Sequence, residues 1–368
     1  MRCAGIGYCT AMRIVVTGAS GNIGTALLRR LAADAFEHHV VGVCRRPPEQ
    51  GEPYEGVEWV PIDLAEPTAS EGLAPVMRAA DAVVHLAWGF QPSHDIDYLE
   101  RVDVGGTRAV LEAADRAGVR HLVHMSSVGA YSAGPDARRV DESWPTEGIA
   151  SSAYSLHKVA AEQLLTAYQR SHPDGVRIAR IRPAFVLQRD AGSALLRYGV
   201  PGFVPAAAVR LLPVLPVDRR LVVQGVHPDD VADAVVRVLE LGGTGAFNLA
   251  AEPPLTRDDI ARVLRAVPVH LPAAVLRVLA MLSWRIRLQP LDPGWVDLAF
   301  RLPLMDAGRA HEELGWRPGT DARAALAEAV EGMAESAGTS SPALRPRSVA
   351  DQLSRLIRRG PIGSRRLP

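Results

Sequence analysis

Three evenly spaced glycines near the start of the chain constrain its fold more than any other feature. Gly18, Gly21 and Gly24 follow a β-branched run, Arg13–Thr17, and open a segment with helical spacing, Ile23–Ala33. In such a unit the first glycine permits a tight turn, the second lets backbone approach a pyrophosphate, and the third lets helix and strand pack closely. The amides and dipole of the helix N-terminus favour the negative charge of phosphates. We therefore predict a dinucleotide-binding turn.

Strands and helices alternate through the first half of the chain. Beyond the first unit, the sequence predicts strands at Val40–Cys44, Val57–Ile62, Ala82–Leu86, His121–Ser126 and Val176–Ile181, and helices at Thr107–Ala117 and Ser155–Arg170. Strands separated by helices pair in parallel through right-handed crossovers. We therefore predict an α/β fold, with a Rossmann doubly wound parallel sheet.

The pattern changes after Pro183, where we expect a smaller α/β C-terminal substrate domain. Between Gly192 and Pro216 the chain is apolar without a clear period, which indicates short helices and loops. Later segments predict helices at Asp229–Leu241, from Thr256, at Pro272–Leu288 and at Asp321–Met333, and a strand at Ala246–Leu249. We divide the chain into an N-terminal extension (1–11), an NAD(P)-binding Rossmann domain (12–183), a substrate-binding region interleaved with the sheet (184–335) and a disordered basic tail (336–368).

Composition excludes some classes of function. The 368 residues include 41 basic and 41 acidic side chains, so no overall field attracts nucleic acid or an anionic membrane. No stretch reaches the ~18 apolar residues that indicate an integral membrane segment. Three cysteines, Cys3, Cys9 and Cys44, are too few for a disulfide framework, so we expect a cytoplasmic protein.

Further motifs extend the glycine turn into a family pattern. In chain order they are Asp63-Leu64, His85-Leu86-Ala87, Gly106-Thr107, Ser126-Ser127, Tyr154 with Lys158, Arg182-Pro183, His227-Pro228-Asp229-Asp230-Val231, Phe247-Asn248-Leu249 and Leu314-Gly315-Trp316. Together with the glycine spacing, this ordered set resembles the extended short-chain dehydrogenase/reductase family, in its NAD-dependent epimerase/dehydratase branch. The resemblance runs from about Arg13 to Met333, and it implies an enzyme that binds a nicotinamide dinucleotide.

The residues after the second strand bear on which dinucleotide is bound. An acidic residue there bonds the ribose of NAD, but this chain has Cys44 followed by Arg45 and Arg46. An arginine pair binds the 2′-phosphate of NADP, so we expect NADP in preference to NAD. The resemblance implies that Asp63 bonds the adenine and that Pro183 lines the nicotinamide pocket. The predicted cofactor-binding residues are Gly18, Gly21, Asn22, Ile23, Gly24, Arg45, Arg46, Asp63, Leu64, Leu86, Ala87, Lys158 and Pro183.

Tyr154 and Lys158 are the candidate catalytic pair. They lie four residues apart, on one face of a predicted helix. A nearby ammonium favours the phenolate, which allows the tyrosine to exchange a proton with a substrate oxygen. The resemblance adds Ser127, which bonds the same oxygen. We expect no metal, since His227 has no other ligand type at zinc-like spacing.

The chain also departs from the family pattern. Sugar-nucleotide dehydratases carry an Asp-Glu pair where this chain has Val128 and Gly129, so their dehydration mechanism is excluded. The arginine that grips a substrate diphosphate in many relatives is replaced within Val223–Gly225, although Arg219 or Arg220 could substitute. Asp103 stands where asparagine is common.

Three functions remain open from the sequence. The first is a reductase or dehydrogenase acting on a free carbonyl or alcohol, for which an apolar region, Gly192–Pro216, suggests a substrate with apolar surface. The second is a nucleotide-sugar 4-epimerase with tightly bound NAD. The third is a non-catalytic, NADP-sensing binding module, against which Ser127, Tyr154 and Lys158 speak. The resemblance also implies a homodimer.

Overall fold

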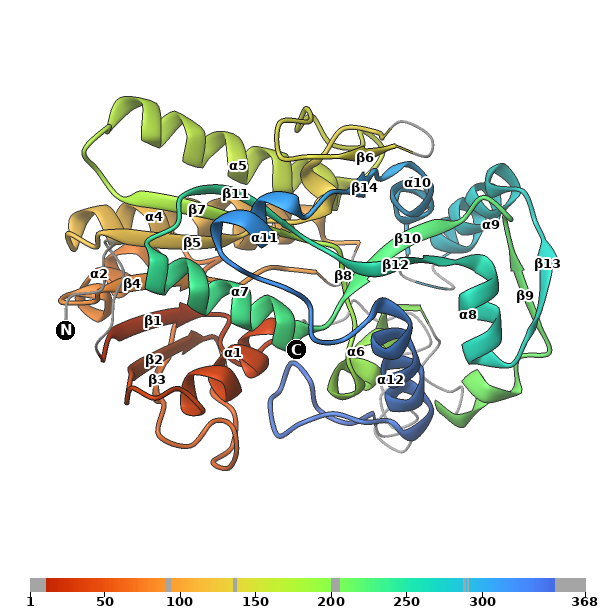
Figure 1. The fold of residues 1–368 in the computed structure, drawn as a ribbon, viewed down its shortest axis with the longest axis horizontal. Coiled ribbons are helices and arrows are strands. Elements are labelled where there is room, and N and C mark those ends of the chain that lie inside the picture. The colour runs from red at the N-terminus through yellow and green to blue at the C-terminus, as the bar shows by residue number, and fades with distance from the viewer. Residues whose placement is uncertain are drawn as a thin grey trace.

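A seven-stranded parallel sheet with helices on both faces forms the centre of the molecule (Figure 1). The computed structural model describes residues 11–90, 94–134, 138–199, 206–286, 289 and 291–347. The sheet has the order β3-β2-β1-β4-β5-β7-β11. Its strands are β1 (Arg13–Thr17), β2 (His39–Cys44), β3 (Glu58–Pro61), β4 (Ala82–His85), β5 (His121–Met125), β7 (Arg177–Pro183) and β11 (Gly245–Leu249). The predicted doubly wound parallel sheet is confirmed.

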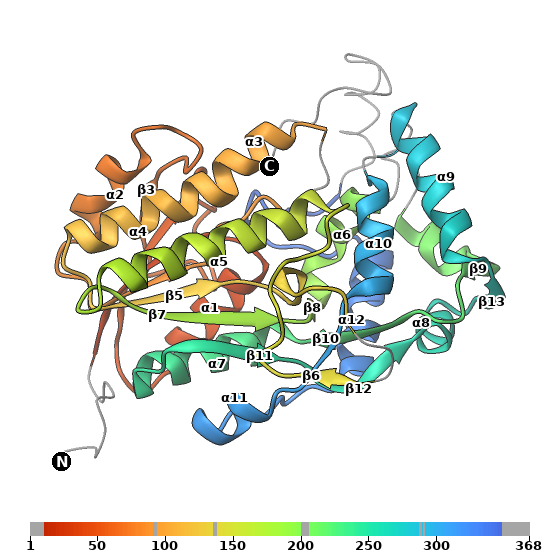
Figure 2. The ribbon, with the colours of Figure 1, turned by 90° about the horizontal axis from the view of Figure 1, so that it is seen from above.

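The central strands are apolar on both faces because helices cover both. In β1, Ile14 and Val16 join one hydrophobic core and Val15 joins the other, and all three are inaccessible to solvent. The helices on the first face are α1 (Asn22–Ala32) and α7 (Pro228–Leu241). Those on the second are α2 (Ala69–Met77), α4 (Gly106–Arg116) and α5 (Ala153–Ser171). Figure 2 shows α4 and α5 running side by side over the sheet.

The direction of winding reverses between β1 and β4. The chain leaves β1 through α1 on one face and leaves β4 for β5 through α4 on the other. At such a reversal the loops after the two strands diverge and leave a crevice at the carboxyl edge of the sheet, where ligands bind in folds of this class. The glycine turn after β1 lies at this edge.

A second, smaller assembly stands beside that edge. Its strands are β8 (Phe185–Val186), β10 (Val222–Val226) and β12 (Ala251–Thr256) in one sheet, β9 (Val214–Val217) with β13 (Val267–His270), and β6 (Arg139–Val140) with β14 (Leu304–Met305). Its helices are α6 (Gly192–Gly199), α8 (Arg257–Leu264), α9 (Ala273–Arg285), α10 (Pro293–Arg301) and α12 (Ala322–Glu335). Helix α11 (Gly308–Glu313) packs instead against β11 of the large sheet. The chain enters the smaller assembly, returns to the large sheet to form α7 and β11, and then enters the smaller assembly again.

Some elements begin earlier than the sequence predicts. The helix expected from Thr107 is preceded by α3 (Ile96–Glu100) and a π-helical turn (Arg101–Gly105), so helical backbone extends from Ile96 to Arg116. Gly105 and Gly106 disfavour a helix intrinsically, but tertiary contacts override this preference. The buried carboxylate of Asp103 accepts from the Gly89 amide (2.6 Å) and holds the turn against the loop after β4.

The end of the chain differs from the prediction of a disordered tail beginning at Ser336. Residues 336–347 fold back from α12 onto the first strand–helix unit, and Ser341 and Leu344 are buried there. Polar residues suggested disorder, but Ser341 donates to the Ser20 carbonyl oxygen (2.6 Å), a partner 321 residues away that no local pattern reveals. Residues 348–368, and residues 1–10 of the predicted extension, lie outside the described residues.

Among the helices that the structure describes, none has the length and apolarity needed to cross a membrane.

Candidate active site

The glycine turn brings the backbone of β1 close to the loop after β4. Gly18 has φ +72°, and its amide donates to the Val43 carbonyl oxygen (2.8 Å). A Cβ on Gly18 would lie 2.6 Å from the Ala87 amide nitrogen, and a Cβ on Gly24 would lie 2.4 Å from the Gly18 carbonyl oxygen. Both positions therefore require glycine, one for its conformation and the close approach, the other for packing α1 against the turn.

Helix α1 begins at this turn without a side-chain cap. Gly21 is its N-cap residue, and no side chain bonds the first amides. Those amides are the groups that donate hydrogen bonds to a phosphate bound at a helix N-terminus. The residues present thus fit a dinucleotide pyrophosphate, by the space that the glycines leave and by the donors that the helix presents.

A cavity of about 400 Å³ extends from the turn along the carboxyl edge of the sheet. All of the predicted site residues line it, namely Gly18, Gly21, Asn22, Ile23, Gly24, Arg45, Arg46, Asp63, Leu64, Leu86, Ala87, Ser127, Tyr154, Lys158 and Pro183. The structure therefore brings together residues that the sequence spreads over 166 positions, from Gly18 to Pro183. Their individual roles are taken up under the proposed function.

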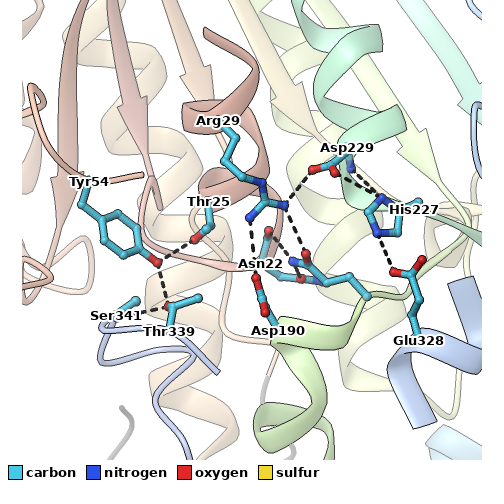
Figure 3. Close-up of polar contacts among 11 residues, drawn as sticks. Asn22, Thr25, Arg29, Tyr54, Asp190, His227, Asp229, Glu328, Thr339 and Ser341 are labelled. Carbon is cyan, nitrogen blue, oxygen red and sulfur yellow. Dashed lines mark hydrogen bonds and ion pairs between the residues drawn. The ribbon is translucent and has the colours of Figure 1, made fainter. Parts of the chain in front are cut away.

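Contacts across the two assemblies hold the start of α1 in place (Figure 3). Gln188 donates to the Asn22 side-chain oxygen (2.5 Å), and Arg29 donates to Asp229 (2.7 Å) and to Gln188 (3.3 Å). His227 caps α7 by accepting from the Asp229 amide, and its Nε2 lies 3.3 Å from Glu328. His227 therefore supports the site without being among the described residues that line the cavity.

Two arginines, Arg45 and Arg46, follow β2 and line the same cavity as the glycine turn. Arg45 donates to the Tyr98 hydroxyl (2.7 Å) and lies 4.0 Å from the Asp63 carboxylate. Asp63 accepts from the Ala65 amide (3.0 Å). Cys44 takes the place of the acidic residue that would bond a ribose, and burial raises the pKa of its thiol, so it carries no charge there at neutral pH.

Tyr154 lies in the first turn of α5, whose start is capped by Ser152. The Ser127 hydroxyl hydrogen-bonds the Tyr154 phenol. Burial raises the pKa of Tyr154, and the negative charge of Asp103 raises it further, while the bond from Ser127 acts in the opposite direction. The phenol is therefore protonated at neutral pH and placed to donate a proton.

Lys158 stands one turn further along α5 and is 2% exposed. Its ammonium donates to the Met125 carbonyl oxygen (2.8 Å) and lies 3.3 Å from the centre of the Trp88 ring, a cation–π contact. Burial lowers the pKa of Lys158 to about 7, although the charges of Asp103 and Glu162 oppose the shift. The lysine is thus poised between its two protonation states near neutral pH.

Two buried polar residues support the loop after β4. His85 lies 2.6 Å from the Thr17 hydroxyl and 3.2 Å from the Thr107 hydroxyl, and burial lowers its pKa to about 3. It is therefore a neutral histidine that ties strand ends together. The Asp103 carboxylate accepts from the Gly89 amide and also lies 3.0 Å from Nδ1 of His157. The aspartate that stands where asparagine is common therefore links the loop after β4 to α5.

Sequence reasoning missed an aromatic enclosure around Tyr154. The rings of Phe90 and Trp295 have centroids 5.3 and 5.4 Å from the Tyr154 ring, and Trp88 lies edge-on at 6.4 Å. Trp295 belongs to α10, which the sequence analysis did not predict. The Asp292-Pro293 pair was an available signal, since aspartate caps α10 and proline occupies its first turn.

A comparison with known families decides the wider assignment. The profile described as "NAD dependent epimerase/dehydratase family" matches residues 14–250, more than half of the chain. The chain belongs to this family. The predicted family is confirmed, and with it the prediction that the chain belongs to a family of enzymes.

Individual relatives in this family carry different names. An uncharacterised protein of Mycobacterium tuberculosis is 28% identical over 320 residues, which are 86% of this chain and 29% of that protein. The chain thus spans less than a third of that relative's length. A UDP-glucose 4-epimerase of Mycolicibacterium smegmatis is 29% identical over 338 residues, 87% of this chain and 98% of that enzyme.

A solved structure supports the fold. The UDP-glucose 4-epimerase of Thermus thermophilus, in complex with NAD, has a TM-score of 0.65 and 22% identity, and the match covers 88% of this chain and 99% of that one. The predicted class of cofactor, a nicotinamide dinucleotide, agrees with the family description and with the NAD bound in that structure.

Within this epimerase/dehydratase chain, the departures from the family pattern have structural reasons. A Cβ on Gly129 would lie 2.8 Å from Cε1 of Tyr154, so no acidic side chain fits there without moving the tyrosine. Gln224 binds both backbone groups of Met305 and fixes β14 instead of facing the cavity. Arg220 pairs with Asp218 (3.0 Å) and, like Arg219, is not among the residues that line the cavity.

Proposed function

We propose that the chain is an NAD(P)-dependent dehydrogenase or reductase, acting at an alcohol or carbonyl carbon whose surroundings are apolar. One observation carries this proposal. The Ser127–Tyr154–Lys158 group shares a single cavity with the glycine turn, and the charged residues among the described lining are Arg45, Arg46, Asp63 and Lys158 alone. Three of these four stand at the end that follows β2 and β3, so among the residues that the structure describes only Lys158 brings charge to the part around Tyr154.

A nicotinamide dinucleotide held at the glycine turn supplies the donor or acceptor of hydride in this chemistry. In reduction, the Tyr154 hydroxyl gives its proton to the carbonyl oxygen as the carbon receives hydride, and the phenolate left behind takes a proton from solvent. In oxidation, the phenolate removes the hydroxyl proton as hydride leaves the carbon. Ser127 donates a hydrogen bond to the same oxygen, and the Lys158 ammonium stabilises the phenolate.

The walls around Tyr154 support an apolar substrate. Helix α10 contributes Trp295 and Leu298, the residue after it is Leu302, and the segment after β7 contributes Ala184 and Phe185. A sugar diphosphate would bring two or more negative charges into this space, and such charges require paired cations when they leave water. A hydrophobic ketone, aldehyde or alcohol fits the walls without that requirement.

We also propose a preference for NADP over NAD. Arg45 and Arg46 follow β2 in the place where the 2′-substituent of the adenosine ribose would stand, and Cys44 offers no carboxylate to the ribose hydroxyls. Guanidinium groups bind phosphate through strong, charge-assisted hydrogen bonds.

A nucleotide-sugar 4-epimerase with retained NAD is the second candidate. The M. smegmatis relative is named as a UDP-glucose 4-epimerase, and the similarity covers nearly all of that enzyme, which favours this candidate. The structure supports it less well, since Gln224 and Arg220 are both engaged away from the cavity.

A substrate panel tests the proposal. NADPH oxidation would be followed with aromatic, alicyclic and long-chain ketones and aldehydes, and interconversion of UDP-glucose and UDP-galactose would be assayed in parallel. The proposal predicts NADPH consumption with at least one hydrophobic carbonyl class, and a rate at least about a hundredfold lower in the Tyr154→Phe variant. Sugar interconversion without net NADPH consumption would replace it with the epimerase.

A further inference from the structure

The segment after α12, here called the strap (residues 336–347), lies along the cavity and bonds the first strand–helix unit of the chain. It leaves α12 at Ser336, and its Ala337 carbonyl oxygen accepts from the Ser193 amide at the start of α6 (3.0 Å). The Thr339 hydroxyl hydrogen-bonds the buried Tyr54 hydroxyl (2.7 Å), which also hydrogen-bonds Thr25 of α1 (3.1 Å), as Figure 3 shows.

The middle of the strap is fastened to the glycine turn itself. The Ser341 hydroxyl donates to the Ser20 carbonyl oxygen, between Gly18 and Gly21, at 2.6 Å. The next three residues, Pro342, Ala343 and Leu344, line the same cavity as the turn. The strap is therefore a wall of the dinucleotide pocket, placed against the loop that would hold the pyrophosphate.

The far end of the strap is pinned as firmly as its start. Arg197 of α6 donates to the carbonyl oxygens of Ala343 (2.6 Å) and Arg345 (2.8 Å), and the Arg347 amide donates to the Ser193 hydroxyl (3.0 Å). Leu344 is 2% exposed. Bonds at both ends thus fix where the exposed residue between them, Arg345, stands relative to the rim of the cavity.

Arg345 joins a group of like charges at that rim. Burial lowers the pKa of Arg46, and the positive charges of Arg45 and Arg345 lower it further, so both of these charges act on the Arg46 guanidinium. Arg46 lines the cavity, and Arg345 directly follows the lining residue Leu344. Converging cations are costly unless an anion neutralises them. A phosphate monoester carries nearly two negative charges at pH 7 and offers three acceptor oxygens, which matches three guanidinium groups.

We propose that the strap completes the cofactor site, with Arg345 acting as a third cation on the 2′-phosphate of NADP and Ser341 fastening the strap over the bound dinucleotide. This inference rests on the proposed function in two respects, that a dinucleotide occupies the cavity and that NADP is preferred to NAD. It assigns recognition of the phosphate to residues from both ends of the chain, Arg45 and Arg46 near the start and Arg345 near the end.

The charge is tested by titrating NADPH, NADH, adenosine 2′,5′-bisphosphate and 5′-AMP into the full-length protein and its Arg345→Ala variant. Loss of a charged hydrogen-bond donor is expected to weaken NADPH and the bisphosphate by about tenfold, and NADH and 5′-AMP by less than about twofold. The control is Arg317→Ala, which removes another exposed arginine, one that is not among the charges acting on Arg46, and should leave all four affinities unchanged.

The bond from Ser341 to the Ser20 carbonyl oxygen is tested with Ser341→Ala. In this variant, dissociation of both NADPH and NADH should accelerate by a similar factor. Its control is Ser171→Ala, whose hydroxyl bonds two carbonyl oxygens of its own helix, α5, and the ring of the neighbouring His172. Thermal unfolding of each variant checks that the fold is intact. If wild-type protein prefers NADPH while Arg345→Ala keeps that preference and Ser341→Ala keeps the release rates, the strap inference is overturned and the proposed function stands. If wild-type protein binds no dinucleotide, both fail.

Discussion

At the scale of single residues, the site depends on two buried groups whose protonation the protein shifts in opposite directions. Burial raises the pKa of Tyr154 and lowers that of Lys158 to about 7. The phenol is thereby kept as a proton donor, while the amine is ready to carry charge when a negative group arrives beside it. This division of roles requires both side chains on one helix face, which their four-residue spacing provides.

Replacement of Tyr154 by phenylalanine removes the proton donor and leaves the ring packing against Phe90 and Trp295. We expect kcat to fall by roughly 10²- to 10⁴-fold, because that is the usual contribution of a positioned acid or base. Dinucleotide affinity should change by less than about threefold. Measured turnover near the wild-type rate would remove Tyr154 from the mechanism.

The buried lysine makes a prediction about stability. Below about pH 7 Lys158 is charged in both the folded and the unfolded protein, so the full cost of burying its ammonium is present. As pH rises from about 7 towards the unfolded value of 10.5, the folded protein sheds the proton first and the cost disappears.

Lys158→Met should therefore be inactive but more stable than wild type below pH 7. The difference in unfolding free energy should be on the order of a few kcal/mol, since each pKa unit corresponds to about 1.4 kcal/mol. Denaturant unfolding from pH 6 to pH 10 should show this difference shrinking as pH rises. A difference that stays constant would mean that the ammonium is not penalised by burial.

Cofactor preference also belongs to the residue scale. Arg45→Ala is expected to weaken NADPH binding by about tenfold or more and NADH binding far less, because only NADPH brings a phosphate to this guanidinium. Isothermal titration of both dinucleotides measures the two losses. Equal losses would show that Arg45 supports the pocket through Tyr98 and Asp63 without reading the 2′-phosphate.

At the scale of elements, helix α5 is tied to the sheet by a buried ion pair. Arg182 of β7 binds Glu162 of α5 through two parallel bonds (2.8 and 2.5 Å), and Ser126 donates to the same carboxylate (2.5 Å). Burial alone would raise the pKa of Glu162, but the bonds and charge of Arg182 outweigh it and lower the pKa. Because Ser126 precedes Ser127, this pair also positions the serine that we propose to be catalytic.

Glu162→Gln should lower the unfolding free energy by about 3–5 kcal/mol, since the Arg182 charge is left buried without its partner. The exposed pair between Arg309 and Glu313 provides the control, and Glu313→Gln should cost less than about 1 kcal/mol. Chemical denaturation compares the two variants. Similar losses in both would mean that the buried pair contributes no more than a surface pair.

The elements that could be predicted are those with a local signature. Gly18 and Gly24 mark the turn because no other residue fits there, and the apolar runs of β1 and β4 mark strands covered on both sides. Helix α10 and the strap could not be predicted in this way. Trp295 and Leu344 owe their places to partners far along the chain, and a short amphipathic or polar segment does not name such partners.

At the scale of the whole molecule, the candidate active site lies where the two assemblies meet. The glycine turn comes from the start of the chain, Tyr154 from the middle, and Trp295 and Leu344 from the last quarter, and all line one cavity. The residues predicted to bind the cofactor could be found in the sequence because they follow consecutive strand ends, and the structure brings them to one cavity. The aromatic half depends on how α10 and the strap pack, which is a tertiary property.

We further propose that the chain forms a homodimer through α4 and α5, which run side by side on the outside of the sheet (Figure 2). Leu156 of α5 is 43% exposed, which is consistent with a contact that a second copy would cover. Leu156→Arg should convert a dimer into a monomer in sedimentation experiments. The matched control, Leu241→Arg at the end of α7, changes a leucine that is 53% exposed and should leave the dimer intact. Wild-type protein that sediments as a monomer would contradict the proposal.

The central claim is that this cavity holds an exchangeable nicotinamide dinucleotide beside Tyr154. The most direct measurement denatures the purified protein, identifies any dinucleotide released, and titrates NADPH and NADH into the stripped protein. We expect reversible binding of both, with NADPH bound more tightly. Tightly retained NAD would favour the epimerase instead, and protein that binds neither dinucleotide would contradict the account as a whole.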